Sequence, residues 1–291
     1  MTRSGHVALA GAPNAGKSTL LNALVGTHLA IVSPKPQATR LPVTGLRTEG
    51  GTQFVFHDLP GLLDPEYLMQ ERMLHAAQEA LKGADVVVHL HPAGDAPAPP
   101  FARVARLEVP VSAPVLTVYT KADLVAPGAR DRLADGGDAV VSALDEASVN
   151  ALLARIEALL PEREFEFDPD DVGTQPLRFF VTEYLREAAF DLLGDELPYA
   201  FNAEVEEFRE AERPMYIRVT LFIERDSQKG IVIGKGGQTI KALGSHARAR
   251  LEELTGSPVY LDLWVKVLPK WRRSAAALAR FGFPASDMEK A

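Results

Sequence analysis

A glycine-rich turn near the N-terminus limits what this 291-residue chain can fold into. The apolar run Val7–Ala10 leads into GAPNAGKS at residues 11–18, and Ser18–Val25 has the spacing of a short helix. A strand that ends in GxxxxGK[ST] and continues as a helix turns backbone N–H groups around a phosphate, with the helix dipole behind them. The motif therefore predicts a strand–turn–helix unit that holds a phosphorylated ligand.

The pattern after this turn predicts an α/β fold. Short, apolar runs at Phe54–Phe56, Asp85–Leu90 and Val115–Tyr119 are typical of buried parallel strands. Helical spacing appears at Tyr67–Leu81 and again at Ala147–Leu160. Strands that alternate with helices predict a mainly parallel sheet sandwiched by helices, over residues 1–162.

The rest of the chain has a different order of elements. Residues 163–176 hold several breaker residues without sustained periodicity, so we expect a linker there. The pattern then predicts a helix, two strands, two helices and a strand, in a smaller α+β domain over residues 177–291. These elements are expected at Phe179–Leu193, Ala200–Phe208, Met215–Glu224, Ser227–Ile233, Thr239–Leu254 and Val259–Val267.

Composition narrows the functional class. The chain has no cysteine, which excludes disulfides and thiolate chemistry. It has no signal-peptide pattern and no apolar run near the roughly 20 residues that span a bilayer, so we expect a cytoplasmic protein. The net charge is −8, yet residues 213–273 carry 12 basic and 5 acidic residues, whereas residues 181–212 carry 2 and 10. Such a basic block is either a polyanion-binding face or an ordinary solvated surface.

Three more motifs indicate that the phosphorylated ligand is GTP. Asp58-Leu-Pro-Gly61 fits DxxG, Thr120-Lys-Ala-Asp123 fits [NT]KxD, and Ser142-Ala143 fits the loop that backs a guanine base. A carboxylate at Asp123 can accept hydrogen bonds from N1–H and from the exocyclic amine of guanine, a pair that adenine does not offer. Because the motifs follow in order after predicted strands, they predict guanine-nucleotide binding.

Each motif assigns roles to its residues. Lys17 is expected to reach the β- and γ-phosphates, Ser18 and Asp58 to hold Mg²⁺, and the N–H of Gly61 to meet the γ-phosphate. The predicted catalytic residues are Lys17, Asp58, Gly61 and Asn14. The predicted nucleotide site comprises Gly11, Ala12, Pro13, Asn14, Ala15, Gly16, Lys17, Ser18, Thr19, Asp58, Leu59, Pro60, Gly61, Leu62, Thr120, Lys121, Asp123, Ser142 and Ala143.

The residue after DxxG predicts slow hydrolysis. A glutamine that orients water often stands there, but this chain has Leu62, which cannot orient water by hydrogen bonding. Asn14 offers a substitute, since its amide oxygen can help to hold K⁺ beside the phosphates; the alternative is a side chain that caps its own loop. Lys35, Arg40 and Arg47 are expected at the surface rather than as arginine fingers.

A second glycine loop predicts RNA binding. Gly234-Lys-Gly-Gly237 contains GxxG between two predicted helices, with Lys235 inside the loop. Glycines let a sugar-phosphate backbone approach the helix ends, as in KH domains, which clamp about four nucleotides. Trp264 is expected in the core and Trp271 on RNA bases. The predicted RNA residues are Gly230, Ile233, Gly234, Lys235, Gly236, Gly237, Lys241, Arg248, Lys270, Trp271, Arg272 and Arg273.

Together these segments resemble the Era family of bacterial GTPases over nearly the whole chain. The resemblance is carried by GAPNAGKSTLLNALVG, QATR, DLPGL, TKAD, VSA, QKGIVIGKGG and LWVKV. It implies a P-loop GTPase domain followed by a type II KH domain, with Thr39 as a further Mg²⁺ ligand. Ala38, Leu59 and Thr120 depart from the usual residues of the family; at Thr120 we expect weaker bracing of the loop with guanine specificity retained.

The resemblance also implies partners. It implies binding to the 3′ end of 16S ribosomal RNA, a role in 30S subunit assembly, a monomeric state and, in some members, peripheral association with the inner membrane. Two alternatives stay open at this point. One is a nucleotide-gated RNA or membrane scaffold with negligible hydrolysis, and the other is a membrane-linked GTPase whose KH domain binds no RNA.

Overall fold

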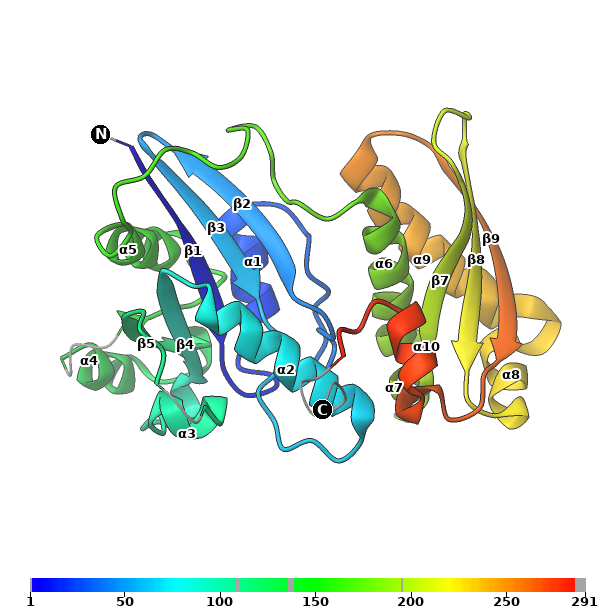
Figure 1. Cartoon of the computed structure of the whole chain (residues 1–291), viewed down its shortest axis with the longest axis horizontal. Coiled ribbons are helices and arrows are strands. Elements are labelled where there is room, and N and C mark those ends of the chain that lie inside the picture. The colour runs from blue at the N-terminus through cyan, green and yellow to red at the C-terminus, as the bar shows by residue number, and fades with distance from the viewer. Residues whose placement is uncertain (1, 108–109, 136–138, 195, 286–291) are drawn as a thin grey trace. The chain divides into compact units, whose positions relative to one another are not determined.

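The computed structural model describes residues 2–285 apart from 108–109, 136–138 and 195 (Figure 1). The chain forms two compact units. The first unit holds Met1–Ala30, Thr39–Glu66 and Gln70–Thr174. The second unit holds Ile31–Ala38, Tyr67–Met69 and Gln175–Ala291. Two short segments from the N-terminal half of the sequence therefore belong to the second unit.

The first unit is built on a six-stranded sheet with the order β2-β3-β1-β4-β5-β6. Strand β2 is antiparallel to β3, and the other neighbours are parallel, which confirms the predicted mainly parallel sheet. The strands are β1 (Arg3–Ala10), β2 (Val43–Glu49), β3 (Thr52–Asp58), β4 (Val86–Pro92), β5 (Val115–Thr120) and β6 (Ala139–Val140).

Helices cover both faces of this sheet. Residues Ala77 and Leu81 of α2 pack with Ala8 of β1 and Val87 of β4 on one face, together with Ala105 of α3. Helices α1 and α5 pack against each other on the opposite face (Figure 1). The helices are α1 (Lys17–Val25), α2 (Leu68–Lys82), α3 (Phe101–Ala105), α4 (Pro127–Asp135) and α5 (Glu146–Glu157).

The segment expected as a linker packs along the edge of the first sheet. The N–H of Leu46 in β2 donates to the carbonyl of Val172 at 2.9 Å. The buried amide of Gln53 donates to the carbonyl of Phe167 at 2.8 Å and accepts from the N–H of Glu166 at 2.8 Å. Residues up to Thr174 thus belong to the first unit. The segment has no periodic apolar face, and hydrogen bonds to β2 and to Gln53 hold it instead.

The C-terminal part of the second unit contains the predicted helix–strand–strand–helix–helix–strand order, with a short helix before the first strand and another after the last strand in addition. Its sheet has the order β7-β8-β9, with β8 parallel to β9, and α6 and α9 lie together on one face (Figure 1). The elements are α6 (Leu177–Leu192), α7 (Leu197–Ala200), β7 (Asn202–Arg209), β8 (Met215–Ile223), α8 (Asp226–Ile233), α9 (Gln238–Thr255), β9 (Val259–Val267) and α10 (Ala275–Arg280).

Hydropathy along the helices adds one observation. Across the residues that the structure describes, no helix is both long enough and apolar enough to pass through a lipid bilayer.

Candidate nucleotide and RNA sites

The phosphate loop lies between the end of β1 and the start of α1. Lys17, the first residue of α1, is buried, and its ammonium donates to the carbonyl oxygens of Gly11 at 3.2 Å and Ala12 at 2.9 Å. Burial lowers the pKa of Lys17 to about 8, an effect that nearby Asp58 partly opposes. A buried cation among backbone dipoles at a helix N-terminus is suited to a phosphate, which supplies the missing negative charge.

Three oxygen-bearing side chains meet beside this loop. The hydroxyl of Ser18 donates to Asp58 Oδ2 at 2.6 Å, the hydroxyl of Thr39 donates to the same oxygen at 3.1 Å, and the two hydroxyl oxygens are 2.9 Å apart. Within the described residues, no group of three or more His, Cys, Asp or Glu residues forms a metal site of protein ligands alone. One carboxylate with hydroxyls and substrate phosphates is how Mg²⁺ is usually bound, so the three predicted ligands fit that ion.

The DxxG segment packs tightly on the phosphate loop. A Cβ on Gly61 would lie 2.8 Å from Pro13 Cγ and 2.9 Å from Pro13 N, so only glycine fits there. The N–H of Leu62 donates to the carbonyl of Gly11 at 3.0 Å. The side chains of Leu59 and Leu62, however, are buried in the hydrophobic cluster under α2. These two residues shape the site through their backbone, and the side chain of Leu62 belongs to the core.

The predicted guanine site lies at the ends of β5 and β6. The hydroxyl of Ser142 donates to Asp123 Oδ1 at 2.7 Å, which fixes the orientation of this exposed carboxylate. Thr120, the last residue of β5, donates from its hydroxyl to the carbonyl of Ala15 at 2.7 Å. This bond ties the base-recognition loop to the phosphate loop. A pocket here is lined by Ala122, Asp123, Arg130, Asp131, Ala134, Val140, Ser142, Leu144, Asp145 and Ser148.

Three residues that the sequence analysis considered for hydrolysis need comment. Asn14 is exposed and has a φ of 61°, a left-handed conformation that asparagine tolerates better than most residues. The backbone therefore gives one reason for asparagine at this position. Arg40 is only 1% exposed, so the expectation of a surface position was wrong for this residue. Arg47 is half-buried, and its guanidinium pairs with Glu49 at 2.6 Å, which does not suit it to act as an arginine finger.

The GKGG loop joins α8 to α9 as predicted. Lys235 and Gly236 are exposed, and Gly236 has a φ of 61° with no heavy atom within 4 Å of the place where a Cβ would be. Gly234 and Gly237 flank them at the ends of the two helices. The loop thus presents backbone and a lysine to the solvent, the arrangement that lets a sugar-phosphate chain approach.

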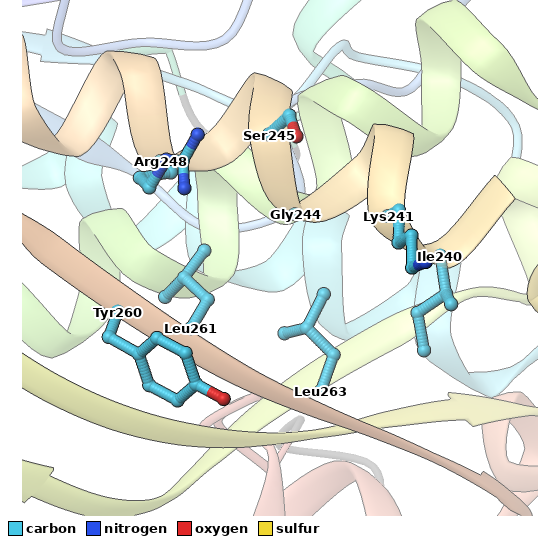
Figure 2. A pocket seen from close by; sticks show the side chains of 8 residues that line it. All are labelled: Ile240, Lys241, Gly244, Ser245, Arg248, Tyr260, Leu261 and Leu263. Atoms are coloured by element: carbon cyan, nitrogen blue, oxygen red, sulfur yellow. The ribbon is translucent and has the colours of Figure 1, made fainter. Parts of the chain in front are cut away.

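A groove continues from this loop between α9 and β9. Figure 2 shows Leu261 and Leu263 reaching from the strand toward α9, with Lys241 and Arg248 on the helix. Tyr260 stands at one side and is exposed. The groove is lined by Ile240, Lys241, Gly244, Ser245, Arg248, Tyr260, Leu261 and Leu263. Of these, only Lys241 and Arg248 were predicted; the apolar residues on the inner face of β9 are the signal that was missed.

The predictions for the two tryptophans were wrong in opposite directions. Trp271 is completely buried, its ring nitrogen donates to the carbonyl of Ala200 at 2.9 Å, and its ring meets Phe281 edge-on. It cannot stack on a base without leaving the core. Trp264 is 58% exposed rather than buried, because it shares the outer face of β9 with Tyr260.

Arg272 is also engaged inside the second unit. Its guanidinium pairs with Glu224 at 2.6 Å and lies over the ring of Tyr67, 5.3 Å from the ring centroid. The prediction that Arg272 contacts RNA is therefore not supported, because RNA would have to displace Glu224. Its neighbours Lys270 and Arg273 are exposed but do not line the groove of Figure 2. Gly230 is exposed in α8, and Ile233 is half-buried at the end of that helix.

Because one tryptophan is buried and the other exposed, we expect their substitution to have different effects on stability. Trp271→Ala should cost about 3–5 kcal/mol in the free energy of unfolding, as for other buried aromatics, and Trp264→Ala about 0.5 kcal/mol or less. Urea unfolding followed by circular dichroism measures both. Since the chain has 2 tryptophans, each variant leaves one reporter: Trp271 should resist iodide quenching and Trp264 should not. Equal quenching of the two would contradict the assignment.

Comparison with known families identifies the same two kinds of domain. Residues 6–121 match the family described as 50S ribosome-binding GTPase, and residues 196–272 match the KH domain. The chain is 38% identical over 291 residues to GTPase Era of Carboxydothermus hydrogenoformans, covering 97% of this chain and 98% of that protein. It is 38% identical to GTPase Era of Thermotoga maritima, covering 93% of each.

Solved structures give the same result. A crystal structure of Era in complex with MgGDPNP and nucleotides 1506–1542 of 16S ribosomal RNA matches with a TM-score of 0.90 and 34% identity, over 97% of this chain and 99% of that chain. A single-substitution variant of Aquifex aeolicus Era bound to GDP·AlF4⁻ matches with a TM-score of 0.89 and 33% identity, over the same shares of the two chains.

Proposed function

Since this chain belongs to the Era family of GTPases, we propose that it is a GTP-hydrolysing switch that binds the 3′ end of 16S ribosomal RNA through its KH domain and assists 30S subunit assembly. The observation that carries the proposal is the presence in one chain of a guanine-type carboxylate, held at 2.7 Å by Ser142, and a basic, apolar-floored groove beside GKGG. The first recognises the nucleotide and the second the RNA.

The nucleotide would be held by groups already in place. The phosphate loop and Lys17 take the phosphates, and Asp123 takes the guanine edge. Ser18, Thr39 and Asp58 would hold Mg²⁺, which neutralises charge on the β- and γ-phosphate oxygens when it is bound. Gly61, which packs closely on Pro13, would present its N–H to the γ-phosphate.

Hydrolysis is proposed to be slow unless it is stimulated. The side chain of Leu62 is buried and cannot orient water, so the chain has no counterpart to the usual glutamine at this position. K⁺ held by Asn14 remains the proposed source of extra positive charge. We expect faster GTP turnover in K⁺ than in Na⁺ at equal ionic strength, and slower turnover in K⁺ for Asn14→Ala. Equal rates in the two salts would remove K⁺ from the proposal.

The RNA groove combines two kinds of recognition. Ile240, Leu261 and Leu263 form an apolar floor on which unpaired bases can be buried. Lys241 and Arg248 lie on the helical wall, where they can meet phosphates. These contacts suit a single strand rather than a duplex, because the bases must be splayed out of a helix to reach the floor.

The experiment that tests the proposal measures RNA affinity in three nucleotide states. A fluorescent oligonucleotide with the 3′-terminal sequence of 16S ribosomal RNA is titrated with protein that is nucleotide-free, loaded with GDP, or loaded with a non-hydrolysable GTP analogue and Mg²⁺. We expect the tightest binding in the GTP-analogue state. Equal affinity in all three states would contradict nucleotide gating, and no binding in any state would favour the membrane-linked alternative.

Gly236→Asp should weaken RNA binding about tenfold or more. A negative charge about 4 Å from a phosphate costs about 1 kcal/mol in bulk water and about 4 kcal/mol near a protein surface. The place where a Cβ would be has no heavy atom within 4 Å, so the new side chain should fit. Gly256→Asp is the matched control. Gly256 caps the C-terminal end of α9, the helix that follows GKGG, and has a φ of 62° and equally open surroundings. RNA affinity that falls equally in both variants would show a general effect of charge or backbone strain, and not a phosphate site at GKGG.

The alternative is a nucleotide-gated scaffold with negligible hydrolysis, which the departures at Ala38, Leu62 and Thr120 favour. Against it stands the bond from the Thr120 hydroxyl to the carbonyl of Ala15 at 2.7 Å, which keeps the predicted base-recognition loop tied to the phosphate loop in spite of the departure at Thr120. Measuring GTP turnover with and without the RNA oligonucleotide, in K⁺ and in Na⁺, separates the two. Absence of turnover in every combination would favour the scaffold.

Location and assembly are proposed with the function. We propose a cytoplasmic location because ribosomal RNA is the proposed partner. A monomeric state and peripheral association with the cytoplasmic face of the membrane are proposed from the family resemblance alone. Light scattering tests the first, and co-sedimentation with anionic vesicles tests the second.

A further inference from the structure

The sheet of the second unit has an outer face that the proposed function does not use. Helices α6 and α9 pack on one face of β7, β8 and β9 (Figure 1). Because side chains alternate along a strand, the opposite face of β9 carries Tyr260, Asp262, Trp264 and Lys266. The register of the sheet places Tyr216 of β8 beside Tyr260, so Tyr216 shares this outer face.

Aromatic side chains are exposed on this face. Trp264 is 58% exposed and Tyr260 is 55% exposed. The ring of Tyr260 stacks on the ring of Tyr216, with the two centroids 5.9 Å apart and the planes inclined by 17°. Single exposed apolar residues are ordinary, but a group of them on one surface indicates a binding site. We call Tyr216, Tyr260 and Trp264 together the outer aromatic face.

Hydrogen bonds fix Tyr216 in one arrangement. Its hydroxyl donates to Asp262 Oδ2 at 2.8 Å and accepts from the guanidinium of Arg218 at 2.8 Å. Arg218 donates to the same carboxylate oxygen at 3.0 Å, and the guanidinium of Arg209 lies over the tyrosine ring, 4.8 Å from its centroid. A ring that is held before a ligand arrives binds it at a lower cost in conformational entropy.

The chemistry of the face favours nucleobases over a protein partner. The outer positions of β9 hold two aromatic residues, an aspartate and a lysine, and no aliphatic residue. The centre of a protein interface is instead apolar and depleted in charged residues. Bases stack on aromatic rings and on arginine planes, and every base has a flat face to offer.

The cations of the face already have partners. Arg218 pairs with Asp262 at 3.0 Å, and Lys266 lies 3.6 Å from a carboxylate oxygen of Glu206. Attraction to phosphates is therefore weak on this side of the sheet. Stacking is the interaction that the face can supply, in contrast to the groove, where Lys241 is available to phosphates.

The outer aromatic face is continuous with the RNA groove. Strand β9 is at the edge of its sheet, with β8 as its neighbour. Its inner face supplies Leu261 and Leu263 to the groove, whereas its outer face carries Trp264. Tyr260 borders both surfaces, since it lines one side of the groove and stacks on Tyr216 (Figure 2). An RNA strand that leaves the groove can therefore pass over the edge of β9 onto the outer face.

We propose that the outer aromatic face is a second RNA-binding surface, where unpaired bases next to those in the groove stack on Trp264 and Tyr260. The inference rests on the proposed function, since it requires a single strand of RNA in the groove. A KH groove clamps about four nucleotides, so a longer unpaired strand has bases left for this face. Because aromatic rings accept every base, the face adds affinity without reading further sequence.

Trp264→Ala should lower the affinity for an unpaired RNA of about twelve nucleotides roughly five- to a hundredfold, the usual range for loss of one stacked base. Trp264→Phe keeps an aromatic ring and should bind nearly as wild type does. The loss in Trp264→Ala should be the same at about 50 and about 200 mM salt, because stacking releases no counterions. The loss in Lys241→Ala should shrink as salt rises, since that contact is to phosphate.

The test titrates the full chain, in the nucleotide state that binds RNA most tightly, with an oligonucleotide of the 3′-terminal sequence of 16S ribosomal RNA. Anisotropy of the labelled RNA gives the affinity, and tryptophan emission at saturation reports stacking. Bases on Trp264 should quench its emission in wild type. Quenching should be absent from Trp264→Ala, where the remaining tryptophan is the buried Trp271. Leu192→Ala is the matched control, since Leu192 is an exposed apolar residue at the end of α6, the helix on the opposite face of the sheet.

The expected result is a loss of affinity and of quenching in Trp264→Ala, with Trp264→Phe and Leu192→Ala close to wild type. Unchanged RNA affinity in Trp264→Ala would overturn the proposal and favour a protein partner for this face. A loss that is equal in Leu192→Ala, or that disappears at the higher salt concentration, would overturn it as well. Gly236→Asp tests the groove separately, so a wild type that binds RNA through GKGG but not through Trp264 contradicts this inference alone. A wild type that binds no RNA contradicts the proposed function too.

Discussion

Lys17→Met is expected to lower the affinity for GTP about a thousandfold, since a unit charge about 4 Å from a phosphate at a protein surface is worth about 4 kcal/mol. The lysine is buried at the head of α1 with its ammonium on two carbonyls of the phosphate loop, so its charge is already where the phosphates must bind. Methionine fills similar space without the charge. Fluorescent-nucleotide titration measures the effect.

The same substitution should leave the free protein as stable as wild type at pH 7, or more stable. Burial depresses the pKa of Lys17 from 10.5 to about 8, so between these values the unfolded chain binds more protons than the folded chain. The unfolding free energy contributed by this group therefore rises as pH increases from about 8 to 10.5. Lys17→Met should lack this rise, which thermal unfolding of both proteins across that pH range will detect.

A control separates the binding effect from a general loss of charge. Lys82 is exposed at the end of α2 and pairs with Glu79 at 2.5 Å, so Lys82→Met removes the same charge from a surface site. It should bind GTP as wild type does. If Lys17→Met kept its affinity for GTP, residues 11–18 would not be the phosphate site, and the functional interpretation of the first unit would be wrong.

The nucleotide site was predictable because each motif demands one local geometry. GAPNAGKS, DLPG and TKAD all follow predicted strands, and parallel strands bring their carboxyl ends to one edge of a sheet. Sequence spacing alone did not place Ser18, Thr39 and Asp58 within 3.1 Å of each other, since they are up to 40 residues apart. For Thr39 the signal was the family resemblance.

The tryptophan errors have a physical explanation in strand parity and in distant contacts. In VYLDLWVKV, Trp264 has the parity of Tyr260, Asp262 and Lys266, so the alternation itself places it on the outer face. Trp271 follows the strand in a basic stretch, and nothing local indicates burial. Its environment is made by Ala200 and Phe281, which only the folded chain brings to it.

Elements without strong local signals were missed. Strand β2 was not predicted because VTGLRTE contains a glycine and polar residues, which suit the edge of a sheet where only one side is paired. The buried charged residues Glu183, Arg186 and Glu187 of α6 were not predicted either. Their burial depends on the segment Ile31–Ala38. Arg186 and its partner Ala38 are 148 residues apart in the sequence, and helical periodicity carries no information about so distant a partner.

Asp123→Asn is expected to exchange guanine for xanthine as the preferred base. The carboxylate accepts from the N1–H and the amine of guanine, whereas an asparagine amide can donate to the oxygen that xanthine carries in place of that amine. Two hydrogen bonds to a charged acceptor, at about 1.5–3 kcal/mol each, correspond to a loss of about 10²- to 10⁴-fold in GTP affinity. Competition of GTP and XTP against a fluorescent nucleotide measures both changes.

The structure refines this expectation through Ser142. Its hydroxyl donates to Asp123 Oδ1 at 2.7 Å, so the carboxylate is oriented before the base arrives. Ser142→Ala should therefore weaken GTP and GDP alike, by about tenfold or less for one bond to a charged group, and leave the preference for guanine intact. Glu146→Gln, an exposed neutralisation at the start of α5, should change neither affinity nor preference.

These variants distinguish recognition by Asp123 from recognition by backbone alone. If Asp123→Asn bound GTP as wild type does and gained nothing for XTP, the base would be read by other groups of this pocket, and the assignment of guanine specificity to the carboxylate would fail. If it lost GTP without gaining XTP while Ser142→Ala shifted the preference, the hydroxyl rather than the carboxylate would contact the base. A gain for XTP with a matching loss for GTP is the one pattern that a carboxylate facing N1 and the amine produces.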